Sequence, residues 1–389
     1  MHGHRRPLIV AAPDSFKGSC SAATAAEAML AGARSVLGDA ADYLALPLAD
    51  GGEGTLDAML QVWGSDPRTV RTTDALGRER EARYGLSGDG AMAIIEAAEA
   101  NGLPWVSDVP PRPLDADTAG VGSIARAALD DGAAQLLLCI GGSATSDGGV
   151  GLLTALGARF LDDRGAPVRP GARGLADIAR VDAEGIDPRA LAADWRIAVD
   201  VDNPLCGPRG AAAVFGPQKG AGAEDIAVID AGLAHLARVL AGAAGIDPQS
   251  YLDRTGLGAA GGMALAVVAL LRAETVAGSD MVADALGVRD ALRDASLVLT
   301  GEGRLDSQSL GGKVVDLVRR EAPAGTPIVV IAGTVQLTAA QTRAAGLTAA
   351  FSIADGPATL DELVDRAESR IAETAAHACA AVLAALRLS

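Results

Sequence analysis

The sequence predicts an α/β protein in which a second α/β domain is inserted into a flavodoxin-like, doubly wound parallel sheet. Short apolar runs alternate with alanine- and leucine-rich segments, which is the order of strands and helices in parallel sheets. Only 3% of the residues are aromatic, and the small and aliphatic side chains that dominate suit helices packed on buried strands. The pattern with which the chain opens returns near residue 295, after a middle region of different character.

The two ends of the chain supply five predicted strands. Residues 7–14 form an apolar run ending in Asp14, and residues 21–38 favour a helix that ends at Gly38. Residues 42–54 and 55–63 repeat this pair, as a strand with a glycine-rich loop and a helix. Near the other end, residues 297–300, 326–334 and 348–356 predict three strands, separated by helices at 311–322 and 338–346 and followed by a helical stretch from Thr359.

The middle region predicts the inserted domain. Residues 68–80 alternate around a turn and predict a hairpin, while residues 134–140 and 195–200 predict buried strands. Residues 121–132, 226–242 and 262–274 favour helices. We therefore expect one domain at 1–65 plus 291–389, an inserted domain at 66–290, and an active site in the cleft between them.

Composition narrows the class of protein. The formal net charge of −16 argues against nucleic-acid and anionic-membrane partners, but a few local cations can still bind a small anion. The four cysteines show no CxxC spacing, which favours free thiols in a reducing compartment. The first apolar run is too short for a signal peptide, and the longest is too short to span a membrane. We expect a cytoplasmic protein and leave a homo-oligomer open.

Acidic residues, glycines and hydroxyls follow five of the predicted strands. Ligands of open parallel sheets bind beyond the carboxyl ends of the strands, and turns alone do not need this repeated combination. Glycine lets backbone N–H groups approach phosphates, and carboxylates suit Mg²⁺. These five strand ends therefore favour a site for phosphates and a divalent ion. In chain order, the residues that follow the five strands are Asp14, Ser15; Asp50, Gly51, Gly52, Glu53; Gly141, Gly142, Ser143, Thr145, Asp147; Asp200, Asp202, Asn203; and Glu302, Asp306.

Lysine is rare in this chain, and each lysine lies beside glycine. Of 33 basic residues only Lys17, Lys219 and Lys313 are lysine. A compact ammonium suits a point contact with phosphate, whereas a chance position or a stem covering apolar surface would be the structural explanation. Histidine is absent from every candidate loop, so an Asp or Glu is expected to act as the general base.

The loops together resemble the bacterial type-1 glycerate kinases. The motifs that carry the resemblance include IVAAPDSFKGSCSA at 9–22, LADGGEGT at 48–55, IGGSATSDGG at 140–149, FGPQKGA at 215–221 and TGEGRLDSQS at 300–309. The resemblance implies a flavodoxin-like domain with an inserted α/β domain, and ATP-dependent, Mg²⁺-assisted phosphorylation of D-glycerate, usually to 2-phosphoglycerate. The run DTAGVGS at 117–123 departs from the family pattern, and so does Asp202, where members can have threonine.

With that resemblance, each candidate residue receives a predicted role. We expect Asp200 to accept the hydroxyl proton of glycerate, and Lys17 and Lys219 to neutralise charge on glycerate or on the transferred phosphoryl group. Glu53 and Glu302 are the predicted metal ligands. The nucleotide is assigned to Gly141, Gly142, Ser143, Thr145 and Lys313, and the substrate to Asp14, Ser15, Asp50, Gly51, Gly52, Asn203 and Asp306.

Two other readings remain open at this stage. The run GLGAAG, with Gly256, Gly258 and Gly261, matches a dinucleotide fingerprint and would suit an NAD-dependent hydroxy-acid dehydrogenase, although no buried strand precedes it. A non-catalytic protein that binds small carboxylates is the other alternative, for which so many acidic strand ends are excessive.

Overall fold

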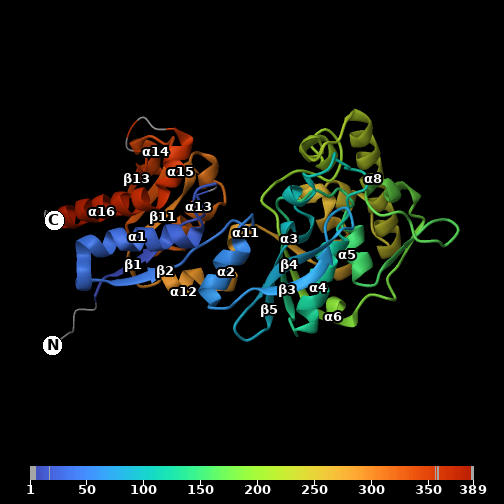
Figure 1. Ribbon diagram of the computed structural model, residues 1–389, viewed down its shortest axis with the longest axis horizontal. Coiled ribbons are helices and arrows are strands. Elements are labelled where there is room, and N and C mark those ends of the chain that lie inside the picture. The colour runs from blue at the N-terminus through green and yellow to red at the C-terminus, as the bar shows by residue number, and fades with distance from the viewer. Residues whose placement is uncertain (1–5, 17, 355, 357–358, 387–389) are drawn as a thin grey trace. The chain divides into compact units, whose positions relative to one another are not determined.

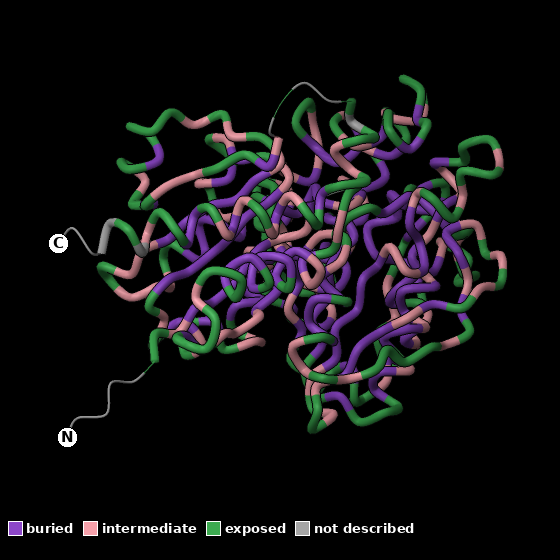
Figure 2. The backbone as a smooth tube through the Cα atoms, turned by 60° about the vertical axis from the view of Figure 1, so that its left-hand side comes forward, coloured by how far each residue is buried: buried purple, intermediate pink, exposed green. Residues whose placement is uncertain are grey.

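The chain divides into two compact units, each built around its own sheet (Figure 1). The computed structural model describes residues 6–16, 18–354, 356 and 359–386. The first unit comprises the described residues of Met1–Asp50, Asp57–Trp63 and Ser279–Ser389, and the second comprises Gly51–Leu56 and Gly64–Gly278. The buried segments in Figure 2 include the central strands of both sheets.

The first unit contains a parallel sheet of five strands among the described residues. They are β1 (Leu8–Ala11), β2 (Asp42–Ala45), β11 (Ala295–Leu305), β12 (Ile328–Val335) and β13 (Ala349–Ser352), in the order β13–β12–β11–β1–β2. All four pairings are parallel. Counted along the chain, this is the flavodoxin order 2-1-3-4-5, whose switch point lies between β1 and β11.

Helices accompany this sheet because its strands are apolar toward both faces. Ile9, Leu299 and Ile331 share one core cluster with residues of α1 and α16, whereas α12 and α13 also contact β11. Helix α1 is capped at its start by Ser21, whose hydroxyl accepts the N–H of Thr24, and at its end by Gly38, where the sequence predicted the helix to stop. The helices of this unit are α1 (Ala22–Leu37), α2 (Thr55–Trp63), α11 (Gly278–Leu286), α12 (Val288–Leu292), α13 (Val314–Glu321), α14 (Ala339–Ala344), α15 (Leu360–Asp365) and α16 (Ala367–Leu386), although Thr55, Leu56 and Gly278 are counted with the second unit.

The second unit contains a mixed sheet of six strands in the described residues. Strands β3 (Arg68–Thr73) and β4 (Glu79–Leu86) form the predicted hairpin, and β4 is antiparallel to β5 (Met92–Glu96). Strands β5, β6 (Gln135–Cys139), β9 (Asp194–Ala198) and β10 (Glu274–Val276) are parallel. Strands β7 (Arg159–Leu161) and β8 (Arg180–Asp182) form a separate ribbon.

Helices and short 3₁₀ segments enclose the mixed sheet. The helices are α3 (Ala98–Asn101), α4 (Ala119–Asp130), α5 (Val150–Ala155), α6 (Pro188–Ala192), α7 (Ala211–Phe215), α8 (Ala223–Ala244), α9 (Gln249–Leu252) and α10 (Ala264–Leu271). The 3₁₀ segments used below are η2 (Leu103–Val106), η4 (Pro217–Lys219) and η5 (Ala259–Gly262). Both sheets and their helices confirm the predicted α/β fold class.

One predicted strand boundary is wrong. We expected the strand before Glu302 to end at Thr300, but β11 continues to Leu305 because its residues keep pairing with β12 as far as Val335. Gly301 permits this pairing, since a Cβ atom there would lie 1.9 Å from the carbonyl oxygen of Ile331. Glu302 is therefore a buried strand residue, with 7% of its surface exposed, and not a loop residue.

Helix α8 is long and apolar enough to cross a membrane by length and composition alone. Its buried residues, among them Ile229, Leu233 and Leu240, belong to the core of the second unit, as expected for an amphipathic helix of a globular protein.

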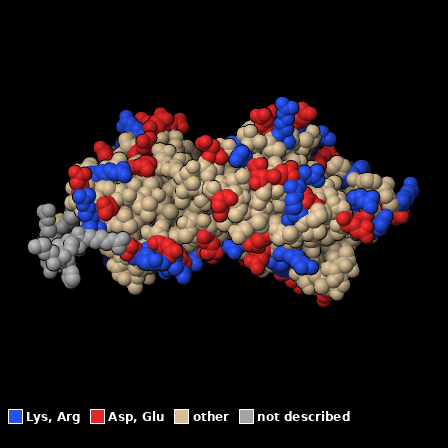
Figure 3. Space-filling model, turned by 90° about the horizontal axis from the view of Figure 1, so that it is seen from below, with Lys and Arg blue, Asp and Glu red and all other residues tan. Residues whose placement is uncertain are grey.

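On the face drawn in Figure 3, acidic and basic side chains are interspersed.

Candidate functional site

In the first unit, three predicted acidic residues lie at the switch point of the sheet: Asp14 and Asp50 follow strands, and Glu302 lies within β11. The backbone N–H of Asp14, beyond β1, bonds to the carbonyl of Gly301 in β11 (2.8 Å), which places Asp14 beside Glu302. The segment after β2 is held in the same way, because Leu48 donates its N–H to Pro13 (2.9 Å) and leads to Asp50. This edge is where open parallel sheets bind ligands.

The acidic residues at this edge influence one another's ionisation. Burial, and next the charge of Asp50, raise the pKa of Asp14 to about 7, and Glu302 adds to the rise. The N–H of Ser15, which donates to the Asp14 carboxylate (2.6 Å), and the charge of Lys313 oppose it. Burial also raises the pKa of Glu302, against a hydrogen bond with Ser309 and the charge of Lys313. A bound cation would relieve the repulsion that these groups share.

The donor set at this edge fits Mg²⁺ held together with a phosphate ligand. The Oε1 atom of Glu302 is buried and has no hydrogen-bond partner within the described part of the chain. Among the described residues, no three His, Cys, Asp or Glu side chains are grouped to hold a metal by themselves. Mg²⁺ commonly uses only one or two carboxylates and takes its other oxygens from phosphates and water. Glu302 suits such a site.

The other predicted residues of the first unit have different surroundings. Lys313 is the N-cap residue of α13 and is half-buried. Asp306 follows β11, and its carboxylate accepts the N–H of Gln308 (2.8 Å) in a local turn. Lys17 lies outside the described residues.

In the second unit, the structure brings together loops that follow three different strands. Gly51, which follows β2 in sequence, lies against Ala198 and Gly278: a Cβ atom on Gly51 would lie 2.7 Å from the Ala198 side chain and 2.8 Å from the Gly278 backbone, and its φ of +86° also requires glycine. A Cβ atom on Gly141 would lie 3.6 Å from Gly52. The predicted residues Gly51, Gly52, Gly141 and Asp200 are thus neighbours.

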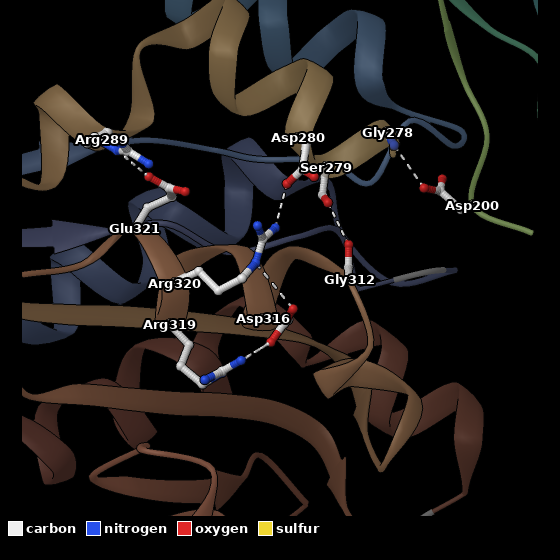
Figure 4. Close-up of polar contacts among 10 residues, drawn as sticks. All are labelled: Asp200, Gly278, Ser279, Asp280, Arg289, Gly312, Asp316, Arg319, Arg320 and Glu321. Atoms are coloured by element: carbon white, nitrogen blue, oxygen red, sulfur yellow. Dashed lines mark hydrogen bonds and ion pairs between the residues drawn. The ribbon is translucent and has the colours of Figure 1, made fainter. Parts of the chain in front are cut away.

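Asp200 follows β9 and has a fixed position at its carboxyl end. Its Oδ1 atom accepts the backbone N–H of Gly278 at 2.8 Å (Figure 4). Its Oδ2 atom would lie 3.5 Å from a Cβ atom on Gly51, and the residue is exposed. A carboxylate that is exposed and yet held by a backbone donor suits a group that positions and deprotonates a substrate hydroxyl.

The chain passes from the second unit to the first at Gly278–Ser279. Ser279 and Asp280, the first residues on the side of the first unit, bond to other residues of that unit. The hydroxyl of Ser279 donates to the carbonyl of Gly312 at 2.5 Å, next to Lys313 (Figure 4). Arg320 donates to Asp280 (2.5 Å) and lies 3.3 Å from Asp316. These bonds connect the start of α11 to the start of α13 and so fix the backbone that carries Lys313.

The glycine loop after β6 divides into exposed and buried parts. Gly141 and Gly142 are exposed, whereas the Ser143 and Thr145 hydroxyls are buried and bond to each other at 3.0 Å. The Thr145 hydroxyl also accepts a hydrogen bond from the side-chain amide of Asn101 (3.2 Å). The two hydroxyls therefore stabilise the loop, and the backbone of the two glycines is its exposed surface. Phosphate binding by this loop stays a prediction.

Lys219 is buried and 6% exposed at the end of η4. Its ammonium donates to the carbonyl oxygen of Thr145 at 2.5 Å. Burial lowers the pKa of Lys219 to about 8, while the charge of Asp147 works in the opposite direction. In this arrangement the ammonium positions the glycine loop. Its predicted contact with glycerate or the transferred phosphoryl group stays a prediction.

The lowered pKa of Lys219 predicts a pH dependence of stability. Between about pH 8 and 10.5 the unfolded chain binds more protons at this residue than the folded chain does, so the free energy of unfolding rises with pH, by at most about 1.4 kcal/mol per pH unit. We expect Lys219→Met to lack this rise. Urea unfolding from pH 7 to 10.5 measures it, with Arg238→Met, at an exposed position, as control. Parallel curves for wild type and Lys219→Met would contradict the assignment.

Two other predicted residues of the second unit lie in loops, Asn203 half-buried and Glu53 exposed. The side-chain amide of Asn203 donates to the carbonyl of Arg209 (2.8 Å) and so shapes the loop after β9. Glu53 is exposed. Substrate binding by Asn203 and metal binding by Glu53 stay predictions.

Sequence reasoning missed the buried residue Glu96 and did not predict the burial of Asp147. Glu96 ends β5, and its carboxylate accepts the N–H of Leu56 (2.7 Å) at the start of α2. Asp147 accepts the N–H groups of Thr118 (2.9 Å) and Gly151 (3.0 Å). The strand pattern that ends in Glu96 resembles those that led to the other acidic residues and could have identified it. Asp147 was noted among the strand-end residues, but its burial depends on long-range packing.

The GLGAAG run is a packing turn. It follows α9 and leads into η5, whereas a dinucleotide fingerprint follows a strand. A Cβ atom on Gly258 would lie 2.2 Å from the carbonyl oxygen of Pro204. This glycine is explained by the loop packed against it, so the dehydrogenase alternative loses its main support.

The fold and the chemistry of these loops define an α/β protein suited to phosphoryl transfer, and comparison with known proteins makes the class specific. The sequence profile of the glycerate kinase family matches residues 9–383. The chain is 41% identical to a glycerate kinase of Bacillus subtilis (strain 168) over 96% of this chain and 97% of the relative. It is 39% identical to the glycerate 2-kinase of Escherichia coli (strain K12), over 97% and 99%.

A crystal structure agrees with these relatives. It is that of a Salmonella typhimurium LT2 protein described provisionally as glycerate kinase 2, which is 42% identical, covers 98% of this chain and 100% of its own, and superposes with a TM-score of 0.88. The chain belongs to the glycerate kinase family. The predicted resemblance, fold class and enzyme class are confirmed.

Proposed function

We propose that this protein transfers the γ-phosphoryl group of ATP to D-glycerate and forms 2-phosphoglycerate and ADP. Family membership supports the reaction class, and the name glycerate 2-kinase of one relative supports the position of transfer. The observation that carries the proposal is a pair of residue groups: Asp14, Asp50 and Glu302 in one unit, and Gly51, Gly141 and Asp200 in the other. Asp50 and Gly51 are consecutive in the chain, which supports their serving one reaction.

Catalysis of this reaction is mainly positioning and electrostatic stabilisation. Asp200, held by the N–H of Gly278, orients the glycerate hydroxyl and accepts its proton at a carboxylate oxygen as the phosphoryl group is transferred. The exposed backbone of Gly141 and Gly142 binds phosphate oxygens. Lys313 adds positive charge beside the acidic residues of the first unit. Lys219 holds the glycine loop through Thr145.

Mg²⁺ is part of this proposal. Glu302, with Asp14 or Asp50 beside it, would hold the ion together with phosphate oxygens of ATP. The ion would neutralise charge on the phosphates and fix their orientation. The raised pKa of Asp14 and Glu302, for which burial is the main cause, fits residues that gain from a neighbouring cation.

Several expectations accompany the reaction. We propose a cytoplasmic enzyme without nucleic-acid or membrane partners, with homo-oligomerisation left open. The domain division at residues 65 and 290, and the active site in a cleft between the domains, stay predictions.

The proposed function is tested by ADP release with a panel of small acids. Purified protein, ATP and Mg²⁺ are combined with D-glycerate, L-glycerate, D-lactate or glycolate, and ADP is measured. We expect D-glycerate to stimulate ADP release by about 10²-fold or more over D-lactate and glycolate, because a site built to bond both hydroxyls discriminates strongly against analogues that lack one. L-Glycerate has both hydroxyls in the opposite configuration, so it measures stereoselectivity separately. Equal or absent stimulation would contradict the proposed substrate.

A further inference from the structure

The second unit contains a largely apolar cavity to which no function has been assigned so far. Of the predicted site residues, Lys219 belongs to its lining. Its volume is about 390 Å³, within the range of small-molecule sites. It is lined by Leu76, Leu103, Pro104, Val106, Ser107, Val109, Pro111, Arg112, Pro113, Ala116, Ala144, Gln218 and Lys219. Part of this lining belongs to a small apolar cluster separate from the main core of the unit, which includes Ala116 and Ala144.

The cavity walls are fixed by ion pairs and hydrogen bonds. Arg78, in the β3–β4 hairpin, lies 2.5 Å from a carboxylate oxygen of Asp74 and 2.7 Å from one of Asp108, and it donates to the carbonyl of Trp105 (2.5 Å). Arg112 on the wall is paired with Asp115 (3.1 Å). The loop of residues 104–116 is therefore held in place, which lowers the cost of binding a ligand.

The cavity is contiguous with the glycine loop. Ala144, in that loop, lines the cavity, and the N–H of the wall residue Leu103 donates to the carbonyl of Gly142 (3.0 Å). Lys219, which also lines the cavity, donates to Thr145 of the same loop. One end of the cavity thus lies beside the exposed backbone of Gly141 and Gly142, to which the phosphates are assigned.

Of the two ligands of the proposed reaction, only ATP has a part that matches apolar walls. D-Glycerate is a small anion with two hydroxyls, and burying it against leucine, valine and proline would leave its polar groups unpaired. Adenine is flat, is buried favourably against aliphatic side chains, and needs few polar partners at its edge. The exposed Gln218 can both donate and accept there.

We propose that this cavity binds the adenine ring of ATP, with Leu76, Leu103, Val106 and Val109 contacting the ring and the glycine loop receiving the phosphates. This inference rests on the proposed use of ATP and adds the location of the base. It assigns nucleotide binding to the second unit.

The test distinguishes binding of the adenine ring from binding of the phosphates. Val106 is half-buried on the cavity wall, so Val106→Trp fills the cavity from its side; Val228→Trp, at an exposed position on α8, is the control. For each protein we would measure the Kd values of ATP and of inorganic tripolyphosphate by calorimetry, and the KM values of both substrates. Val106→Trp is expected to raise the Kd and KM of ATP about tenfold or more, and to leave tripolyphosphate binding and the KM of D-glycerate within about twofold.

Two results would overturn the inference: unchanged ATP affinity in Val106→Trp, or equal weakening of ATP and tripolyphosphate. Val109→Trp fills the same cavity from the neighbouring loop and takes the place of Val106→Trp where that variant does not fold. Because the Kd measurement needs no turnover, a protein that binds ATP in this way but leaves D-glycerate unphosphorylated would contradict the proposed function and still support the base site.

Discussion

Replacing Asp200 by asparagine is expected to lower kcat for D-glycerate phosphorylation by about 10²–10⁴-fold, the usual contribution of a positioned general base. Asparagine keeps an Oδ1 atom that can accept the Gly278 N–H, so the geometry after β9 should persist while the charge is lost. The KM of ATP should change little, because the residue acts on the acceptor hydroxyl. Initial rates over a full substrate matrix measure both constants.

Asp202 supplies the matched control for this variant. It lies two residues further on, is strongly exposed, and pairs with Arg209 at 3.0 Å. Asp202→Asn should leave kcat within about twofold, because exposed ion pairs contribute little. If Asp200→Asn instead weakens ATP binding and changes the Mg²⁺ requirement, then Asp200 is a metal ligand. If it behaves like Asp202→Asn, the reaction takes place away from β9.

Glu302→Gln is expected to raise the Mg²⁺ concentration for half-maximal activity by about 10–100-fold, comparable to other losses of support around a metal site. The amide has the size of the carboxylate but cannot offer the buried, unpartnered Oε1 as an anionic ligand. Melting should change little, because the variant removes a buried charge without leaving a cavity. Rates titrated with Mg²⁺ at saturating ATP and D-glycerate provide the measurement.

Glu321→Gln is the control for the loss of a carboxylate in the same unit. Glu321, at the end of α13, pairs with the exposed Arg289 at 2.7 Å (Figure 4). Its Mg²⁺ requirement should equal that of the wild type. An unchanged requirement in Glu302→Gln as well would exclude Glu302 as the metal ligand and return attention to Asp14 and Asp50.

Local patterns were sufficient to predict much of the fold. The helix ending at Gly38, the hairpin of β3 and β4, and the strands before Asp14 and Asp200 follow from apolar periodicity and turn residues alone. The end of β11 could not be predicted in this way. Its extension to Leu305 depends on pairing with β12, about thirty residues further along the chain, and local propensity contains no information on that partner.

The candidate site shows the same division between local and long-range information. That Asp14 and Glu302 lie at one switch point follows from the strand order, which the repeated pattern at the two chain ends predicted. The surroundings of Lys219 did not follow, because a lysine beside glycine is usually solvated. Its burial against Thr145, 74 residues away, is set by the packing of η4 on the glycine loop. The residue types were sufficient to predict the chemistry of the site, whereas the burial of each residue could be known only from the folded structure.

Phosphorus NMR of the reaction product tests the central claim most directly. The purified protein would be incubated with ATP, Mg²⁺ and D-glycerate, and the phosphate ester would be assigned by its coupling to the carbon-bound protons. Phosphate on the C2 hydroxyl couples to a single proton, and phosphate on the C3 hydroxyl couples to the two protons of a methylene group. We expect 2-phosphoglycerate in amounts equal to the ADP released. A product phosphorylated at C3, or ADP without any phosphoglycerate, would contradict the account.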